Sequence, residues 1–240
     1  MTPSVTILTP TTGKSSLYKL IQSIDSQDIP YVHILLWDDK REDDFLYPNP
    51  KTFETLSPMN VTKFSNTRSG SCRYSIAIPG STVQGMAYGS SLRSVGIMAS
   101  QTDFITFADS DVWWESDHLK YLLKAIEGKN WAYCKRKIWS NKNNKIEYLG
   151  IDNFESVGDS TDRKVPYEMV DNNCMIFTRR FGTSGAVLYR ETNGEYNDDR
   201  KMYAFLKQHA GIPGKASVAT VNQICPKRLE DMFSSLCTKS

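Results

Sequence analysis

The stretch Phe104-Ile105-Thr106-Phe107-Ala108-Asp109-Ser110-Asp111 joins an apolar run of strand character to two carboxylates. The run is predicted to be a buried strand, with Asp109 and Asp111 at its carboxyl end. Because residues two apart in an extended or turning backbone can face the same side, both carboxylates are placed to meet one cation. Oxygen-only ligation of this kind suits Mg²⁺ or Mn²⁺. A capped turn after a core strand would give the same pattern, since Asp and Ser are common turn residues.

The composition is that of an ordinary globular protein, and it argues against several classes of function. The chain has 240 residues, which is compatible with one α/β domain or two very small ones and allows a sizeable core. Its formal net charge of +2 sets no strong field, so a nucleic-acid partner is not expected. No stretch reaches the length of a membrane-spanning helix.

Five cysteines are scattered along the chain, without a C-x-x-C pair. This usage indicates reduced thiols in a cytosolic compartment rather than a disulfide framework. The 3 histidines lie far apart, so a structural zinc site is not expected. Residues 1–4 lack the basic-then-apolar pattern of a signal peptide. We therefore expect a cytoplasmic protein, and the tail helix with Lys227, Arg228, Phe233 and Leu236 leaves open a peripheral contact with the inner face of the membrane.

The first forty residues predict a strand, a helix and a second strand. Residues 5–10 form a short apolar run ended by Pro10, and helical spacing of apolar residues follows until Pro30. Residues 31–37 form a second buried run that terminates in Asp38 and Asp39. This order is typical of a βαβ unit with parallel strands and a right-handed crossover. Open α/β sheets bind their ligands at the carboxyl ends of such strands, where these acids lie.

The middle of the chain is less regular. Residues 43–58 are predicted to be a loop or a short irregular helix, and residues 61–64 a weak strand. Residues 65–81 are rich in Ser, Gly and Arg without any period, which fits either a mobile lid or an exposed loop. Residues 86–100 are predicted to be a helix that carries Arg93, and its glycines would allow close packing on a sheet.

Further elements follow the opening stretch, and the sequence contains no repeat or linker. The predicted elements are a helix around Leu119, Leu122, Leu123 and Ile126, strands over 130–137, 145–151, 175–178 and 218–221, an aperiodic segment over 181–190, a helix capped by Asn197, and a helical tail from Pro226. We expect one domain over residues 1–240, with a nucleotide-binding part over about 1–112 and an acceptor-binding part over about 113–240.

The order of these features resembles that of the GT-A glycosyltransferases, in particular the inverting family 2 enzymes. The likeness covers residues 5 to about 210 and is strongest over 5–40 and 85–122. It implies an α/β fold of the GT-A, Rossmann-like kind, with a mixed, mostly parallel sheet flanked by helices. It also implies a hexosyltransferase that works in surface polysaccharide synthesis. The expected donor is a nucleotide sugar, in particular a UDP-sugar.

The resemblance implies a role for each matching residue on the donor side. Thr9, Pro10 and Thr11 match the turn that borders the nucleotide, and Asp38 or Asp39 matches the acid that contacts the uracil or the ribose. Arg93 matches a basic residue expected near the diphosphate or the acidic motif. The expected nucleotide-sugar-binding group is therefore Thr9, Pro10, Thr11, Asp38, Asp39, Arg93, Asp109 and Ser110.

The resemblance also implies a metal site and a catalytic base. Asp109 and Asp111 match the family's D-x-D pair, which holds Mn²⁺ or Mg²⁺, and Asp111 is the expected direct ligand. Asp198 and Asp199 match the acidic pair at a helix start, where one carboxylate takes the proton of the acceptor hydroxyl. Asp198 stands where Glu is commoner, which leaves open which acid is the base. Two acids at a helix start also stabilise its dipole without any catalytic role.

The acceptor is expected to be a saccharide or a lipid-linked sugar. Trp113 and Trp114 either offer it an apolar face or anchor the core, and the sequence favours neither. Two other functions stay open for this fold. A sugar nucleotidyltransferase would favour a glycine-rich loop after the first strand, where this chain has Gly13 alone among residues 11–14. A non-catalytic module would bind the sugar or nucleotide without turnover.

Overall fold

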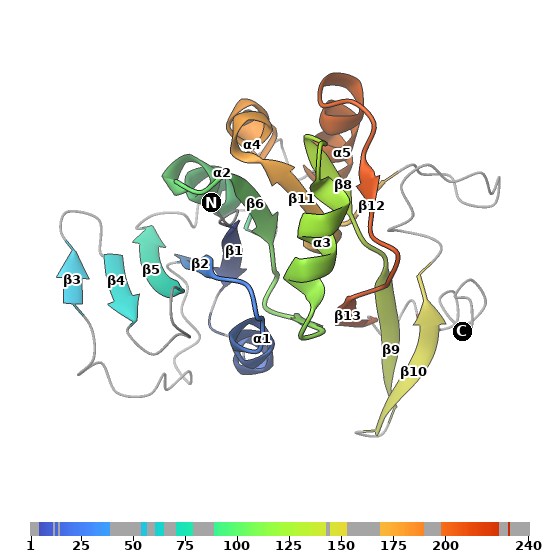
Figure 1. The fold of residues 1–240 in the computed structure, drawn as a ribbon. Helices are drawn as coiled ribbons and strands as arrows, with labels where there is room; N and C mark the ends of the chain where they lie inside the picture. The colour runs from blue at the N-terminus through green and yellow to red at the C-terminus, as the bar shows by residue number, and fades with distance from the viewer. Residues whose placement is uncertain are drawn as a thin grey trace.

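A computed structural model describes residues 5–11, 13, 15–38, 54–56, 61–64, 71–78, 89–142, 145–152, 169–189, 198–225 and 230. Within these residues the strands form two sheets (Figure 1). The larger sheet has nine strands, in the spatial order β12 (Gly214–Lys215), β8 (Trp131–Tyr133), β11 (Met175–Thr178), β6 (Phe104–Phe107), β1 (Val5–Thr11), β2 (Tyr31–Asp38), β5 (Cys72–Ile78), β4 (Val61–Phe64) and β3 (Glu54–Leu56).

The centre of the large sheet is parallel, and its outer strands are mixed. β1 pairs in parallel with β2 and with β6, so that Val5 lies opposite both Tyr31 and Phe104. β5 extends the parallel set beyond β2, whereas β11 runs antiparallel between β6 and β8. The predicted βαβ unit and the mixed α/β sheet are confirmed. Because β1, β2 and β6 are parallel, their carboxyl ends meet at one edge.

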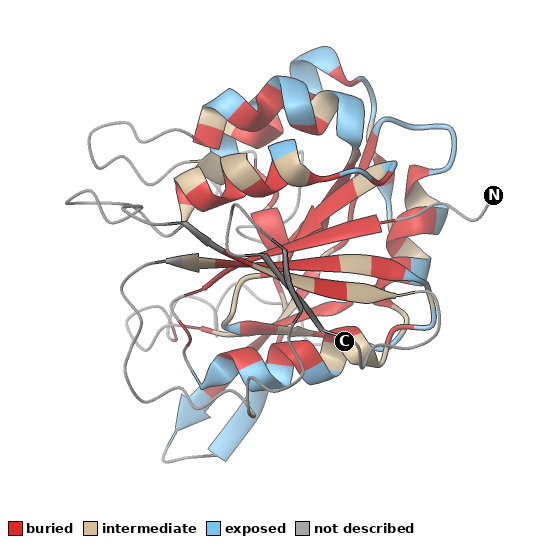
Figure 2. Cartoon of the chain, turned by 90° about the vertical axis from the view of Figure 1, so that its left-hand side faces the viewer, coloured by how far each residue is buried: buried red, intermediate tan, exposed pale blue. Residues whose placement is uncertain are grey.

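Helices cover both faces of this sheet (Figures 1 and 2). One face carries α2 (Ser90–Ala99), α4 (Arg179–Gly185) and α5 (Asp198–His209), and the other carries α1 (Ser16–Asp25) and α3 (His118–Ile126). Figure 2 shows buried strands between these layers. The approach of α2 is close, because a Cβ at Gly96 would lie 2.7 Å from Leu36 and 3.0 Å from Leu8. The expectation that glycines let this helix pack tightly is thus confirmed.

The smaller sheet has four strands among the described residues, in the order β10 (Lys145–Ile151), β9 (Arg136–Lys142), β13 (Val221–Ile224) and β7 (Val112–Trp114). The prediction of a single strand over 130–137 is wrong, because this segment contributes β8 to one sheet and the start of β9 to the other. The change of sheet occurs at Cys134 and Lys135, where the Cys134 amide donates to the Cys174 carbonyl (2.9 Å). The second half of the chain therefore builds part of both sheets.

Several other elements differ from the predictions. The segment read as aperiodic over 65–81 contains β5, whose pattern was hidden because Arg73 points into a buried polar network. A short strand, β3, interrupts the predicted loop over 43–58. The segment over 181–190 contains the end of α4 and a 3₁₀ turn, η3 (Ala186–Tyr189). The last strand covers residues 221–224 rather than 218–221, because Val218 is exposed and Val221 is buried.

Parts of two predictions lie outside the described residues. Asn197, the expected helix cap, is outside, although α5 begins at Asp198 immediately after it. Of the predicted tail helix, Glu230 alone is described, at 4.0 Å from the Lys142 ammonium. No helix in the described ranges combines the length and apolar character that crossing a membrane requires.

Candidate active site

The acidic motif forms a tight turn at the carboxyl end of β6. The Ala108 amide donates to the Leu8 carbonyl (3.0 Å), which keeps the chain beside β1 for one more residue. The Val112 amide then donates to the Asp109 carbonyl (3.2 Å) and closes the turn. Asp109 is half-buried and Asp111 is exposed, so the two carboxylates have different surroundings.

Asp109 is held from two sides. Arg93 on α2 is 5% exposed, and its Nη2 lies 2.5 Å from Asp109 Oδ1. Asn173 accepts a bond from the Asp109 amide (2.6 Å) and donates from Nδ2 to Asp109 Oδ2 (3.1 Å). Burial is the largest single effect and lowers the pKa of Arg93, but the charges of Asp109, Tyr189 and Asp198 and the hydrogen bond to Asp109 together outweigh it, so that the net direction is upward. The predicted proximity of Arg93 to the acidic motif is therefore observed.

Asn173 was missed by sequence reasoning, and it belongs to a larger polar network. It lies in the 3₁₀ turn η2 (Asn172–Cys174), where its backbone and side-chain amides both donate to Asp171 Oδ1 (2.8 Å each). Asp171 Oδ2 in turn lies 2.7 Å from Nη1 of the buried Arg136. The signal was the polar run Asp171-Asn172-Asn173 just before β11, the antiparallel neighbour of β6.

The acidic pair at the start of α5 lies beside the start of α2. Asp198 accepts a hydrogen bond from the Ser90 hydroxyl at the start of α2. Burial raises the pKa of Asp198, and the charge of Arg93 opposes that rise. Asp199 accepts from the Arg200 amide (2.8 Å). Arg93 thus lies in the field of both acidic clusters, which are far apart in sequence.

Asp199 has the more strongly perturbed carboxyl group. Burial first, and then the negative charge of Asp171, raise the pKa of Asp199 to about 6, although Arg200 and Arg93 pull it down. A carboxylate with a pKa near the working pH suits general base catalysis. This environment distinguishes the two acids, which the sequence did not.

The end of β1 lies next to these groups, and His33 of the neighbouring strand β2 fixes its Thr9 side chain. Thr9, Pro10 and Thr11 are buried, and the Thr9 hydroxyl lies 2.9 Å from His33 Nε2. Arg73 Nε donates to His33 Nδ1 (2.8 Å), so the proton of the neutral ring is on Nε2, which donates to Thr9. Burial and then the charge of Arg73 lower the pKa of His33, which keeps the ring neutral.

Two expected donor residues are only partly placed. Asp38 ends β2, where its backbone pairs with Ile78, but its side chain lies outside the described residues. Asp39 lies outside them entirely. Their roles stay predictions.

The arrangement fits a divalent cation that a ligand helps to hold. No three acidic, histidine or cysteine side chains in the described ranges gather as a metal site would need. Mg²⁺ in particular is commonly bound by one or two carboxylates together with substrate phosphates. Both oxygens of Asp109 are engaged by Arg93 and Asn173, whereas Asp111 is exposed at the same edge. The donor set therefore fits a cation on Asp111, with Asp109 behind it.

The two tryptophans after the motif separate into different environments. Trp114 is 3% exposed and stacks on His118 (centroids 4.1 Å apart), so it is a core residue. Trp113 is half-buried on the opposite face of β7, where the Lys19 ammonium lies 3.1 Å from its ring centroid. Of the pair, Trp113 alone stays accessible to a ligand.

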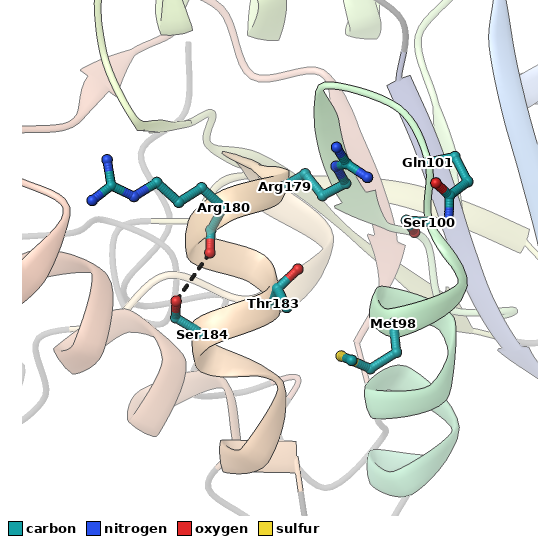
Figure 3. A pocket seen from close by; sticks show the side chains of 7 residues that line it. All are labelled: Met98, Ser100, Gln101, Arg179, Arg180, Thr183 and Ser184. Carbon is teal, nitrogen blue, oxygen red and sulfur yellow. Dashed lines mark hydrogen bonds between the residues drawn. The ribbon is translucent and has the colours of Figure 1, made fainter.

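A cavity of about 510 Å³ lies at the other end of α2 and β6 (Figure 3). Met98, Gln101, Arg179 and Thr183 are among its lining residues. In Figure 3 the Arg179 side chain extends toward Gln101, whereas Arg180 points away from the space between the helices. None of the predicted site residues lines this cavity, so it is separate from the site.

The edge where these groups meet and the order of the strands define a GT-A fold, the class that the sequence resembles. Neither known protein families nor curated proteins include a match to this chain. Solved structures do match over most of its length.

The solved structures most useful for comparison are those of S. aureus TarS, a GT-A-type glycosyltransferase. The TarS 1–349 crystal structure is 16% identical, with a TM-score of 0.62, over 92% of this chain and 60% of that one. TarS 1–349 in complex with UDP-GlcNAc is 15% identical (TM-score 0.62; 93% of this chain, 59% of that one), and its UDP complex is also 15% identical (TM-score 0.63; 95% and 62%). At this identity the likeness establishes the fold, and the chain spans about 60% of the TarS 1–349 length.

Proposed function

We propose that this protein is an inverting glycosyltransferase that moves a sugar from a nucleotide donor, with UDP as the carrier, to a saccharide or lipid-linked acceptor. The observation that carries the proposal is the position of Arg93 between the D-x-D turn and the acidic start of α5. The TarS structures with UDP-GlcNAc and with UDP support it, because they share the fold.

The donor side of the mechanism would use the turn after β6 and the end of β1. Asp111 would hold Mn²⁺ or Mg²⁺, whose charge stabilises the negative charge that gathers on a diphosphate leaving group. Arg93 and Asn173 hold Asp109 in a fixed orientation behind that position. The buried Thr9–His33 contact fixes the wall that the nucleotide would border.

The acceptor side would use Asp199 as general base. A sugar hydroxyl has a very high pKa, so a positioned carboxylate must take its proton as the bond to the anomeric carbon forms. The acceptor oxygen then attacks from the face opposite the leaving diphosphate, and the configuration inverts, as in inverting glycoside hydrolysis. Asp198, tied to Ser90, would orient the start of α5 rather than exchange protons.

Calorimetry with UDP, followed by a screen of UDP-, GDP- and dTDP-sugars for Mn²⁺-dependent hydrolysis, tests the proposal. We expect UDP to bind and a UDP-sugar to release UDP. Formation of a UDP-sugar from UTP and a sugar phosphate would instead indicate a nucleotidyltransferase. Absence of nucleotide binding, with or without Mn²⁺, would favour a non-catalytic module. The cytoplasmic location and a peripheral membrane contact stay predictions.

A further inference from the structure

One face of the smaller sheet carries a diagonal row of aromatic rings. Side chains alternate between the two faces of a strand, and on β9 Arg136, Ile138 and Ser140 point into the core. Trp139 therefore points outward, and Tyr148 of β10 is paired directly opposite it.

Three rings of this row lie one beside the next across the sheet. We call these three residues, Trp113, Trp139 and Tyr148, the aromatic ladder. The centroids of Trp113 and Trp139 are 6.0 Å apart, and those of Trp139 and Tyr148 are 5.1 Å apart. Exposure increases outward, from the half-buried Trp113 and Trp139 to Tyr148, which is 39% exposed. The β9–β10 hairpin that carries the outer rings projects from the body of the protein (Figure 1).

The inner end of the ladder begins just after the acidic motif in the chain. Trp113 is two residues beyond Asp111 in the chain, and it lies under Lys19 in the first turn of α1. α1 follows the end of β1, the strand whose final residues are predicted to border the nucleotide. The ladder therefore leads away from the site across the smaller sheet.

Polar side chains accompany the rings on the same face. Trp139 Nε1 donates to Asn222 Oδ1 (2.9 Å), which fixes the orientation of the indole. The Glu115 carboxylate accepts from Asn222 Nδ2 (3.1 Å) and from the Lys137 ammonium (2.7 Å). The Glu115 side chain is 40% exposed and that of Lys137 is 28% exposed, so donors and acceptors lie at the surface beside the rings.

We propose that the aromatic ladder is a binding surface for the saccharide chain of the acceptor, with consecutive pyranose rings stacked on Trp139 and Tyr148 and their hydroxyls bonded to Glu115 and Lys137. A pyranose has an apolar face of C–H groups and a polar rim of hydroxyls. Amphipathic rings beside surface carboxylate and ammonium groups match both parts. A lipid surface would match the rings but would leave Glu115 facing acyl chains or anionic headgroups.

The role of the ladder as an acceptor site rests on the proposed function. Saccharide binding to the ladder can nevertheless be tested independently of that function. Isothermal titration calorimetry would be run with cello-, malto- and chito-oligosaccharides, each as the mono-, tri- and pentasaccharide. The same samples would be titrated with UDP, which reports on the donor half. We expect tri- and pentasaccharides of at least one series to bind, and the monosaccharide to bind at least about tenfold more weakly, because one sugar covers one ring.

Variants locate the binding surface. Trp139→Ala and Tyr148→Ala should each weaken oligosaccharide binding about tenfold, and Trp139→Phe should retain most of it, because a ring is kept. Ile212→Ala is the matched control, since Ile212 is a large hydrophobic residue that is 79% exposed elsewhere. Should Trp139→Ala fail to fold, Trp139→Phe and the exposed Tyr148→Ala carry the comparison.

The results that would overturn the inference are distinct from failure of the proposed function. It is overturned if no oligosaccharide of the panel binds, or if binding is unchanged in the Trp139 and Tyr148 variants. Loss of binding to phosphatidylglycerol vesicles in those variants, without any saccharide binding, would assign the ladder to a membrane instead. Failure of UDP to bind would count against the glycosyltransferase assignment and not against the ladder.

Discussion

Arg93 and Asp109 form an ion pair of 2.5 Å across the junction of α2 and β6, and the arginine is almost completely buried. This pair places a fixed positive charge directly behind the turn that presents Asp111. It also links the turn to the start of α5, because Arg93 lies in the field of Asp198. The consequences can be tested one residue at a time.

Replacing Arg93 by methionine leaves Asp109 partly buried and without its cation. Removal of one partner of a buried pair costs about 3–5 kcal/mol, and the partial exposure of Asp109 reduces that to about 1–3 kcal/mol. Sugar transfer should fall at least about 100-fold, because the motif loses its orientation. Urea unfolding and steady-state kinetics measure both effects. Arg179→Met, at an exposed arginine, is the control and should change neither.

Asn173→Ala removes the two hydrogen bonds that hold Asp109 on its other side. We expect a loss of about 1–3 kcal/mol in the free energy of unfolding and a fall in transfer of about tenfold or more. Asn130→Ala is matched, since the Asn130 side chain donates one bond to the Ala210 carbonyl away from the site. If Asn173→Ala transferred sugar at the wild-type rate, the hydrogen bonds between Asn173 and Asp109 would have no role in transfer.

Asp111→Asn should abolish transfer and weaken Mn²⁺ binding while leaving the fold intact, because this side chain is exposed. Chelation of divalent cations with EDTA should give the same loss in the wild-type protein, reversed by Mn²⁺. Titration calorimetry with Mn²⁺ in the presence of UDP measures the affinity. Asp103→Asn, an exposed acid before the other end of β6, should bind Mn²⁺ normally. Full activity in Asp111→Asn would show that Asp111 is not a required metal ligand.

Transfer should follow the ionisation of Asp199. A base must be deprotonated, so kcat/KM should rise with pH through about 6, the pKa of Asp199 in the folded protein. Asp171→Asn removes a like charge and should move the rising limb of the kcat/KM profile to lower pH. A limb that stays in place would show that Asp171 does not influence the base.

Stability should show the opposite dependence on pH. The folded protein holds the proton of Asp199 more tightly than the unfolded chain, whose Asp pKa is about 3.9. The stabilisation from that proton is present below the unfolded pKa and is lost as pH rises through about 6. Asp199→Asn should therefore be inactive and yet more stable at pH 8, by about 1–2 kcal/mol. Urea unfolding at pH 5 and pH 8 measures the difference.

The sequence predicted the parts of the fold that depend on local patterns. The unit β1–α1–β2 and the strand β6 have apolar runs of the right length, and the acids at the ends of β2 and β6 indicate the edge of the sheet where the candidate site lies. The strand β5 was missed because Arg73 is paired with His33 and Asp25, residues forty and more positions away. A single sequence does not show that a buried arginine has such partners.

The candidate site could be outlined from the sequence to a similar extent. As candidates whose roles stay predictions, Arg93, Asp109 and the acids of α5 were singled out because their types and order are informative. Asn173 was not, because its role arises from β11 lying antiparallel to β6, a pairing between segments about seventy residues apart. The difference between the pKa shifts of Asp198 and Asp199 likewise depends on the fold, first through the burial of Asp199 and then through the charge of Asp171.

Comparing wild-type protein with Asp199→Asn in one assay tests directly whether Asp199 is the base of an inverting transfer. Both would be titrated with UDP in the presence of Mn²⁺, and then given the UDP-sugar that the hydrolysis screen selects, together with an oligosaccharide acceptor. We expect equal UDP affinity for the two proteins, and a product of inverted anomeric configuration, seen by NMR, with wild-type protein alone. Transfer by Asp199→Asn at the wild-type rate, or retention of the donor's configuration, would contradict this role of Asp199.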